Sequence, residues 1–188
     1  MTENIKILKS EYLFRRPWLT VRRDSIELPN GNRVPEYYVL EYPDWANVVA
    51  VTEDRQIVLT RQYRHGIGRV LWEIPCGVLE PDDPSPMAGA QRELLEETGF
   101  GGGEWSELMV VSANPSTTSN LTHCFLATGV RRLADQHLDS GECLEVYLKP
   151  ESEVRGMMER GEFLQALHLA PLLKYFGLPA PEKGPLHP

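Results

Sequence analysis

The sequence predicts a mixed α/β fold, a sandwich in which a sheet of short strands packs between helices. β-Branched residues dominate residues 46–52 (ANVVAVT) and recur in residues 56–63 (QIVLTRQY), and a turn separates the two. Residues 87–98 form a run of good helix formers that ends before Gly99, where a helix C-cap belongs. Further strands are predicted at residues 71–74, 107–113, 122–127 and 143–148, and further helices over residues 150–160 and 165–176. Strands and helices that share one chain in this way indicate a layered α/β domain.

A β-hairpin is predicted ahead of this sandwich. Residues 18–28 (WLTVRRDSIEL) alternate enough for a strand, residues 29–32 (PNGN) are a turn signal, and residues 34–42 form the return strand. Residues 1–16 are only weakly patterned, so no strand is predicted there. A lone hairpin is marginal in water and must pack on the main domain or on a second subunit. The expected domains are residues 1–44, residues 45–177 and a proline-rich tail over residues 178–188.

The composition of the chain narrows the classes of partner and compartment that suit this protein. The 188 residues suit one domain with a small appendage, and the formal net charge of −8 argues against a nucleic-acid partner, because phosphate contacts need clustered Lys and Arg. The three cysteines, Cys76, Cys124 and Cys143, show no ligand-like spacing and lie in apolar segments, which favours buried thiols in a reducing compartment. With no signal peptide and no apolar run that could cross a bilayer, we expect a cytoplasmic protein without a membrane partner.

Three glutamates mark the predicted helix over residues 87–98. Glu93, Glu96 and Glu97 stand at i, i+3 and i+4, which places their carboxylates on one helix face. Like charges this close repel by roughly a few tenths of a kcal/mol per pair, so an isolated helix gains nothing from them. A hard divalent cation reverses that sign, because Mg²⁺ and Mn²⁺ prefer carboxylate oxygen. A solvated acidic face is the alternative, and the surrounding pattern decides between the two.

That pattern resembles the Nudix box of the nucleoside-diphosphate-linked-moiety hydrolases. The family consensus is Gly, five residues, Glu, seven residues, and then Arg-Glu-hydrophobic-any-Glu-Glu-any-Gly-hydrophobic. Its second half matches RELLEETGF at residues 92–100 without a gap. In the first half, fourteen residues separate Gly77 from Arg92 where the family has thirteen, and Asp82 or Asp83 replaces the loop glutamate. The resemblance covers roughly residues 18–176 and implies a Nudix-type α/β/α sandwich with a mixed sheet, plus the N-terminal hairpin.

The resemblance also implies a metal site. Glu93 and Glu97 resemble the family's metal ligands, Glu96 lies in or beside the same cluster, and the main-chain carbonyl of Cys76 resembles the backbone ligand. Two or three Mg²⁺ or Mn²⁺ ions are implied. Arg92 resembles the box arginine that orients a neighbouring carboxylate, a task suited to a planar fork of donors.

Outside the box, three further roles are expected. Arg64, in the run RQYR, resembles the substrate-contacting arginine of the ADP-ribose-cleaving subgroup, and Arg61 is a weaker candidate for the same contact with a phosphate or ribose. Glu73 either joins the metal network or forms a structural salt bridge. Glu142, at the loop-to-strand junction of residues 139–146 (DSGECLEV), is the expected general base, with Glu145 as the alternative.

The implied activity is metal-dependent hydrolysis of a pyrophosphate bond in a nucleoside diphosphate linked to another moiety, ADP-ribose or a nucleotide sugar, giving two phosphate monoesters. The hairpin is similar to one that builds a homodimer in the ADP-ribose pyrophosphatase subgroup. Trp18 and Trp45 are candidates to stack on a base there, with simple packing as the alternative. The loop over residues 112–120 (SANPSTTSN) is expected to read the terminal group, although it lacks the Ser-Pro-Gly character typical of ADP-ribose enzymes.

Two other functions stay open. A nucleotide-sensing module without catalysis usually loses helix carboxylates, whereas all three are present here. A housecleaning nucleoside triphosphate pyrophosphatase is disfavoured by the N-terminal hairpin, which the smaller members of that kind lack.

Overall fold

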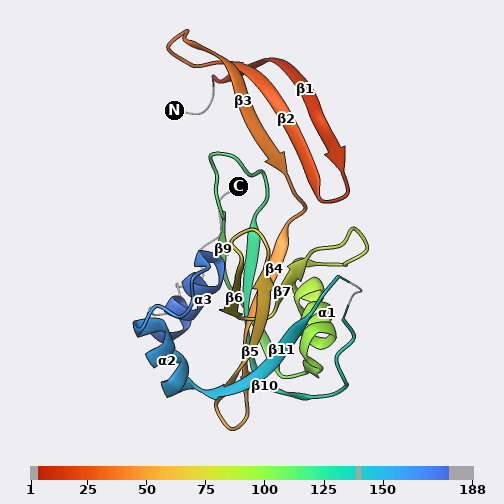
Figure 1. Cartoon of the computed structure of the whole chain (residues 1–188), viewed down its shortest axis with the longest axis vertical. Helices are drawn as coiled ribbons and strands as arrows, with labels where there is room; N and C mark the ends of the chain where they lie inside the picture. The colour runs from red at the N-terminus through yellow and green to blue at the C-terminus, as the bar shows by residue number, and fades with distance from the viewer. Residues whose placement is uncertain (1–3, 139–140, 178–188) are drawn as a thin grey trace. The chain divides into compact units, whose positions relative to one another are not determined.

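The computed structural model describes residues 4–138 and 141–177 (Figure 1). The chain divides into two compact units: the chain up to Asp44 together with Ser112–Leu121, and Trp45–Val111 together with the chain from Thr122 onward. The predicted assignment of residue ranges to domains stays a prediction, and the proline-rich tail over residues 178–188 lies outside the described residues.

The N-terminal unit contains an antiparallel sheet of three strands, β1 (Lys6–Arg16), β2 (Leu19–Glu27) and β3 (Arg33–Glu41), in that order. The predicted hairpin is therefore β2 and β3, but the expectation that residues 1–16 hold no strand is wrong. The register of β1 on β2 shifts twice, between Ile7 and Lys9 and between Tyr12 and Phe14. Each bulge inserts a residue and breaks the period-two alternation by which a strand is recognised in sequence.

The segment Ser112–Leu121 packs on β3 within the same unit. Leu40 of β3 forms a parallel bridge with Thr118, and its N–H donates to the carbonyl of Thr117 at 2.6 Å. The hydroxyl of Tyr37 donates to the carbonyl of Ser116 at 2.7 Å. The loop expected to read the substrate's terminal group is thus held by main-chain contacts to the N-terminal sheet, an arrangement that the sequence did not indicate.

The second unit is a mixed sheet whose main path runs β11–β5–β4–β10–β8. Its strands are β4 (Trp45–Thr52), β5 (Gln56–Arg64), β6 (Arg69–Glu73), β7 (Cys76–Val78), β8 (Phe100–Gly101), β9 (Glu104–Val111), β10 (Thr122–Arg132) and β11 (Leu144–Pro150). Strands β4 and β10 run parallel, and the other neighbours are antiparallel. Side strands extend this path, because β6 pairs with β5, β7 with β4 and β9 with β10.

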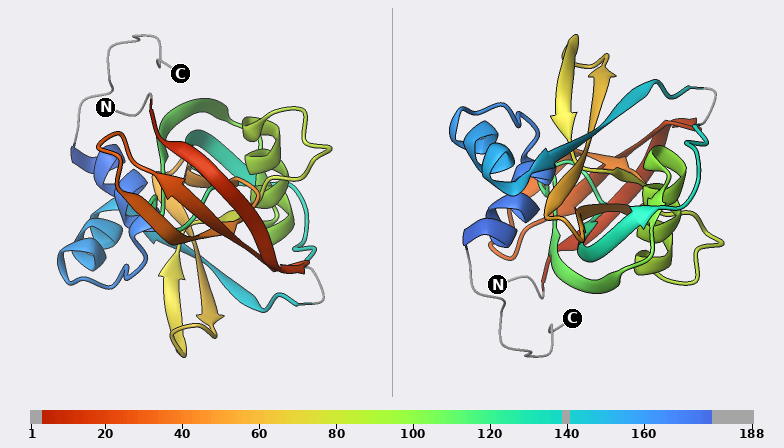
Figure 2. Two further views of the ribbon diagram at one scale, coloured as in Figure 1. Left: turned by 90° about the horizontal axis from the view of Figure 1, so that it is seen from above. Right: turned by 90° about the horizontal axis from the view of Figure 1, so that it is seen from below.

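Helices cover both faces of this sheet, as the views of Figures 1 and 2 show. Helix α1 (Pro86–Thr98) packs on one face, where Val48 of β4 and Leu94 of α1 share a buried cluster. Helices α2 (Glu151–Glu159) and α3 (Ala166–Gly177) cover the other face, where Val49 of β4 packs with Val154 and Leu172. Successive β4 residues are buried on opposite faces, so the strand is buried along nearly its whole length and its middle, residues 48–51, is an apolar run. The predicted sandwich is confirmed.

Helix α1 has well-defined ends. The Ser85 hydroxyl caps its start by accepting the Ala88 N–H at 3.2 Å, and Pro86 occupies the first turn. Gly99 closes it in the left-handed conformation, with φ of 74°, and donates its N–H to the Leu95 carbonyl at 2.8 Å. These local signals fix the length of the helix that carries the three glutamates.

We expect Gly99→Ala to lower the free energy of unfolding by about 2 kcal/mol or more, because two effects add. An Ala there adopts a left-handed φ, and its Cβ would lie 2.2 Å from the carbonyl oxygen of Ala134. Gly102→Ala is the matched control, since Gly102 has φ of 73° but no described atom within 4 Å of an added Cβ. Chemical denaturation of both variants measures the difference. Equal losses in the two variants would contradict the steric part of the prediction.

Candidate active site

Two glutamates of α1 meet the backbone of β7. The N–H of Cys76 donates to Oε2 of Glu97 at 3.0 Å, and the Glu97 residue is only 3% exposed. One turn earlier, the carboxylate of Glu93 lies directly over Gly77, so close that a Cβ on this glycine would sit 2.1 Å from the Glu93 carboxyl carbon. Gly77 is therefore needed because it lets the Glu93 side chain approach the main chain.

We expect Gly77→Ala to lower kcat/KM by about 100-fold or more, because the added methyl displaces the Glu93 carboxylate and misplacements on the order of 1 Å cost about this much. The fold should persist, since the carboxylate can turn outward. Gly66→Ala is the control, because no described atom lies within 4 Å of a Cβ at that position. Steady-state kinetics and a thermal melt separate the two effects, and an active Gly77→Ala enzyme would show that Glu93 does not need this close approach.

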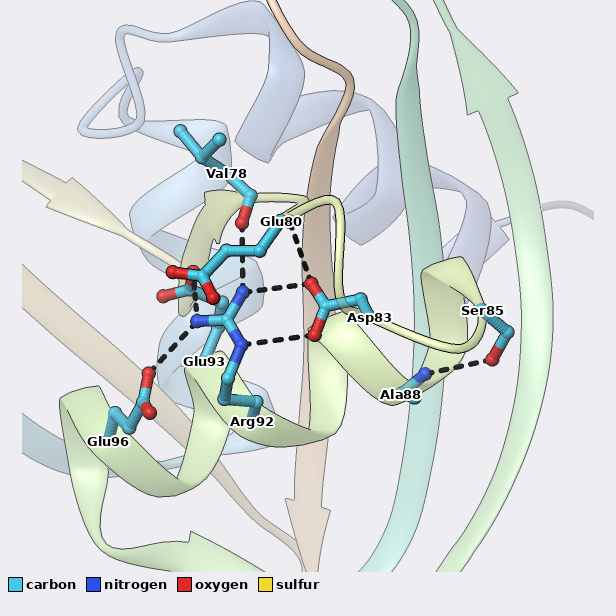
Figure 3. Close-up of polar contacts among 8 residues, drawn as sticks. All are labelled: Val78, Glu80, Asp83, Ser85, Ala88, Arg92, Glu93 and Glu96. Atoms are coloured by element: carbon cyan, nitrogen blue, oxygen red, sulfur yellow. Dashed lines mark hydrogen bonds and ion pairs between the residues drawn. The ribbon is translucent and has the colours of Figure 1, made fainter.

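Arg92 connects the loop before α1 to the glutamates (Figure 3). Its Nε and Nη2 donate to the two oxygens of Asp83 at 3.1 and 3.0 Å, and Nη2 also donates to the Val78 carbonyl at 3.0 Å. Its Nη1 donates to Glu93 at 2.9 Å and to Glu96 at 3.0 Å. Of the two aspartates that could replace the consensus glutamate, Asp83 is thus the one bonded to Arg92. Arg92 thus contacts three carboxylates, those of Asp83, Glu93 and Glu96.

The buried carboxylates resist ionisation. Burial raises the pKa of Glu93 to about 7, against the opposing effect of Arg92, while Glu96 and Glu142 raise it further. Burial also raises the pKa of Glu97 well above its usual range, and the charges of Glu93 and Glu142 add to that rise. Carboxylates in this state need either a proton or a cation.

The donor set fits a hard divalent cation. The carboxylates of Glu93 and Glu97 offer oxygen donors of the kind that such a cation prefers. Both lie against β7, the strand that also contains the main-chain carbonyl of Cys76. Glu96 is 41% exposed in its side chain and lies at the rim, bonded to Arg92. A cation held here would offset the charges that burial disfavours. The ligand set suggested by the sequence stays a prediction, which this geometry permits.

The Glu93 pKa of about 7 predicts that metal binding weakens in acid, because a cation binds only the carboxylate form and protons compete with it. The pKa is raised above the ordinary 4.5, so the charge on Glu93 destabilises the metal-free fold increasingly as pH rises from about 4.5 through 7. We therefore expect the rise in melting temperature caused by Mg²⁺ to be larger at pH 8 than at pH 6. Melts with and without Mg²⁺ at each pH measure this.

Glu93→Gln is the control for this prediction. The amide does not titrate in this range, so the part of the pH dependence that Glu93 contributes should be lost in the variant, and the part that remains should follow Glu97, whose pKa is also raised. A wild-type response that is the same at both pH values would contradict a Glu93 proton that competes with the metal.

A second polar cluster lies beside the first. Arg64 of β5 donates from Nε to Oε1 of Glu73 at 2.8 Å and from Nη2 to Oε2 at 2.5 Å, and this pairing raises the arginine's pKa. The Glu73 side chain is 1% exposed, whereas that of Arg64 is 38% exposed. Of the two roles left open for Glu73, the structure shows the salt bridge. Its partner is the arginine that the sequence analysis assigned to substrate.

The same cluster has ligand-type atoms close together: those of Glu73, Cys76 and His168 all lie within 4.8 Å of one another. The Arg64 guanidinium already lies there, with Nη2 3.9 Å from the Cys76 sulfur and bonded to Glu73. A divalent ion about 4 Å from that charge would be repelled by roughly 8 kcal/mol at an effective dielectric constant of about 20. Arg64 therefore supplies the positive charge at this cluster.

The remaining candidates are dispersed. Glu142 is half-buried, and its charge contributes to the raised pKa values of Glu93 and Glu97. Arg61 is exposed and lies over the Trp72 ring, 5.5 Å from its centroid. Because Arg61 and Arg64 are three residues apart in a strand, they point to opposite faces. Among the described residues, no hydrogen bond or ion pair joins Arg61 to Glu93 or Glu97.

The two tryptophans belong to different units. Trp18 lies in the N-terminal unit and is 83% exposed, whereas Trp45 begins β4 in the second unit and is half-buried.

Sequence reasoning missed His168, a residue of the last helix whose ring lies beside Cys76. Nothing in that helix marks it as part of a site formed by a residue 92 positions earlier in the chain.

Comparisons with known proteins agree with this geometry. A family model of the NUDIX domain matches residues 42–167, two thirds of the chain. The chain belongs to the Nudix family. A second model, the nucleoside diphosphate sugar hydrolase N-terminal domain, matches residues 5–40 of this Nudix protein. Nudix hydrolases use divalent metals, in accord with the oxygen donors of α1. Among the described residues, no helix has the length and apolarity that a membrane span requires.

Several characterised Nudix proteins are similar over most of their length. The chain is 29% identical over 172 residues to the ADP-ribose pyrophosphatase of Mycobacterium tuberculosis (strain ATCC 25618 / H37Rv), covering 90% of this chain and 82% of that protein. It is 30% identical over 142 residues to the ADP-ribose pyrophosphatase of Bacillus subtilis (strain 168), covering 75% and 76%. A crystal structure of an ADP compounds hydrolase superposes with a TM-score of 0.79 at 25% identity, covering 94% and 97%.

Proposed function

We propose that this Nudix pyrophosphohydrolase cleaves the pyrophosphate bond of ADP-ribose or a related nucleotide sugar and releases two phosphate monoesters. The reaction class, hydrolysis of a nucleoside diphosphate linked to another moiety, follows from the family and from its pyrophosphatase relatives. The observation that carries the proposal is the intact pair Glu93 and Glu97 at the backbone of β7, in a chain whose N-terminal segment matches the nucleoside diphosphate sugar hydrolases.

Glu93, Glu97 and the Cys76 carbonyl are proposed to hold two or three Mg²⁺ or Mn²⁺ ions, with Glu96 beside them. When bound, these ions offset charge on the phosphoryl oxygens and lower the pKa of a water. Arg92, held by Asp83, keeps Glu93 and Glu96 oriented, so the ligands are positioned before the metal arrives.

Glu142 is proposed as the general base, which accepts a proton from the attacking water as that water adds in line to phosphorus. The support is electrostatic, since its charge reaches both Glu93 and Glu97. Glu145 is exposed on β11, and its carboxylate already accepts a hydrogen bond from the Tyr147 hydroxyl at 2.8 Å, so it is the weaker candidate. The proton that Glu142 takes leaves to solvent once the two monophosphates separate.

Arg64 is proposed to bind a phosphate or ribose of the substrate. Glu73 holds two of its nitrogen atoms, while more than a third of the side chain stays accessible. A guanidinium fixed by a buried carboxylate presents its remaining donors in a set direction, which favours recognition of a phosphate oxygen. Arg61, which lies over Trp72, is a weaker candidate for the same contact.

A homodimer built through the N-terminal sheet is part of the proposal. The three strands and the turn between β1 and β2 expose many large apolar side chains, among them Ile7, Phe14, Trp18, Leu19 and Tyr38. Exposed apolar area of this kind on a small sheet indicates an interaction surface. Trp18 and Trp45 are proposed to stack on a base. The three cysteines are free, which agrees with the proposed reducing, cytoplasmic location. The expectation that all three thiols are buried is wrong, because Cys124 is buried, Cys76 is half-buried and Cys143, just before β11, is exposed.

The test incubates purified protein and Mg²⁺ with ADP-ribose, GDP-mannose, ADP-glucose, NADH, diadenosine polyphosphates and nucleoside triphosphates, and follows products by ³¹P NMR. Conversion of one diphosphate-linked compound to two monophosphates supports the proposal and names the substrate. Release of pyrophosphate from a triphosphate indicates a housecleaning enzyme instead. If nothing is cleaved while one compound raises the melting temperature, the chain is a sensing module.

A further inference from the structure

His168 is a buried titratable residue that the proposed mechanism does not use. It lies in the first turn of α3, on the opposite face of the sheet from α1, and is 1% exposed. Its Nε2 is 3.7 Å from Oε2 of Glu73 and 3.9 Å from the sulfur of Cys76. The same Glu73 oxygen accepts Nη2 of Arg64. The imidazole therefore touches the buried side of the ion pair whose exposed side is the Arg64 guanidinium.

The imidazole is neutral at this position. Burial lowers the pKa of His168 to about 4, and the nearby Arg64 charge lowers it further, although Glu73 opposes both. A neutral imidazole carries one proton, and Nδ1 has no hydrogen-bond partner in the described part of the chain. The proton belongs on Nε2, where the Cys76 sulfur at 3.9 Å can accept it. The same N–H lies 3.7 Å from the carboxylate that holds Arg64, longer than a hydrogen bond, so the His168 ring packs against Glu73 with its positive edge toward the charge.

The backbone around His168 is anchored as well. The carbonyl of Leu167 accepts the side-chain amide of Asn47 at 2.8 Å, and Asn47 lies in the central strand β4, next to Cys76 of β7 in register. The start of α3 is therefore tied to the strands that also carry the metal-binding backbone. A ring mounted on such a fixed point can restrict the carboxylate that it faces.

We propose that His168 is a positioning residue for substrate: its imidazole holds the Glu73 carboxylate in place, and Glu73 in turn aims the Arg64 guanidinium at a substrate phosphate or ribose. The inference rests on the proposed role of Arg64 in substrate binding. Arg64 is pulled toward one side by Glu73, and without a contact behind it this carboxylate can rotate and take the guanidinium with it. Loss of the imidazole N–H dipole thus weakens substrate binding while the metal ligands stay as they are.

The test replaces His168 by Leu, an apolar residue of similar size, and measures kinetics on the compound that the wild type cleaves. We expect KM to rise by about tenfold, because the buried carboxylate loses the N–H dipole that faces it, with kcat changed by less than about threefold. His168→Gln, whose amide nitrogen can reach the place of Nε2, should restore most of the affinity. His168→Met replaces the Leu variant if that one does not fold.

Two controls separate positioning from mere packing. Leu172→Val trims a buried residue of the same helix that packs in the apolar cluster, and it should leave KM unchanged. In an Arg64→Ala background, His168→Leu should have no further effect on kcat/KM, because both act on one contact. An unchanged KM in His168→Leu, or a full additional loss in the Arg64→Ala background, overturns the inference.

A binding-independent readout keeps this inference distinct from the proposed function. The Arg64 Nε–H donates to Glu73 at 2.8 Å, so its ¹⁵N–¹H signal reports that contact directly. A signal that shifts in His168→Leu and not in Leu172→Val supports the positioning role, whether or not the wild type cleaves any of the compounds offered. If none is cleaved, the proposed contact between Arg64 and substrate fails, but the contact between His168 and Glu73 stands. A signal that is unchanged in His168→Leu overturns the role whatever the activity.

Discussion

Glu97→Gln should lower kcat/KM by three orders of magnitude or more while the protein stays folded. Electrostatic stabilisation by a metal is worth several kcal/mol in the transition state, and about 4 kcal/mol corresponds to roughly a thousandfold. The amide oxygen of Gln can still accept the Cys76 N–H, so the local structure is retained. Because burial raises the pKa of Glu97 well above its usual range, a neutral amide should leave the metal-free protein as stable or more stable.

Three measurements test this expectation: activity at saturating Mg²⁺, the melting temperature without metal, and the rise in melting temperature caused by Mg²⁺. Activity and the metal-induced rise should both be lost. Glu159→Gln, the same change at an exposed position of α2, is the matched control and should behave as wild type. Near wild-type activity of Glu97→Gln at saturating Mg²⁺ would remove Glu97 from the ligand set.

Glu142→Gln should lower kcat by about 10² to 10⁴-fold and leave metal binding intact. A positioned general base contributes roughly this much, and the amide cannot take the proton of the attacking water. The metal ligands on α1 are unchanged in this variant. Removal of the Glu142 charge lowers the pKa values of Glu93 and Glu97 but also removes a negative charge that attracts the cation, so the two effects oppose each other and the response to Mg²⁺ should change little.

The kinetics of Glu142→Gln and Glu145→Gln are compared at saturating substrate and Mg²⁺, together with the metal-induced rise in melting temperature. Loss of kcat in Glu142→Gln with an undiminished response to Mg²⁺ assigns the base. If Glu145→Gln loses kcat and Glu142→Gln does not, the base is on β11. Loss of the Mg²⁺ response in Glu142→Gln would instead make Glu142 a metal ligand.

The helix that carries the chemistry was predictable because its signals are local. Capping at Ser85 and Gly99, the proline at Pro86 and the spacing of the glutamates all act within a few residues. The first strand was not predictable in the same way, because its two bulges remove the alternation that marks a strand. The contact of residues 112–121 with β3 depends on segments about 80 residues apart in sequence, as with Tyr37 and Ser116.

The spacing of the two arginines in β5 is a further sequence signal. Arg61 and Arg64 are three positions apart in a predicted strand, so their side chains point to opposite faces. The two arginines therefore do not both reach one substrate group. The structure places Arg61 on Trp72 and Arg64 on Glu73. Period-two counting alone would have favoured one of the two.

The sequence by itself determined the family, the mixed α/β fold and the helix face with Glu93 and Glu97, because each depends on spacing within a short segment. Only the tertiary structure decided which charges meet. Asp83 rather than Asp82 binds Arg92, and Glu73 pairs with Arg64 in front of a buried imidazole. The first two pairings each join residues nine positions apart, across a loop or a strand pair whose exact shape the sequence does not specify, and the imidazole comes from the distant helix α3. Burial then sets their pKa values. Local sequence carries no record of either distance or desolvation.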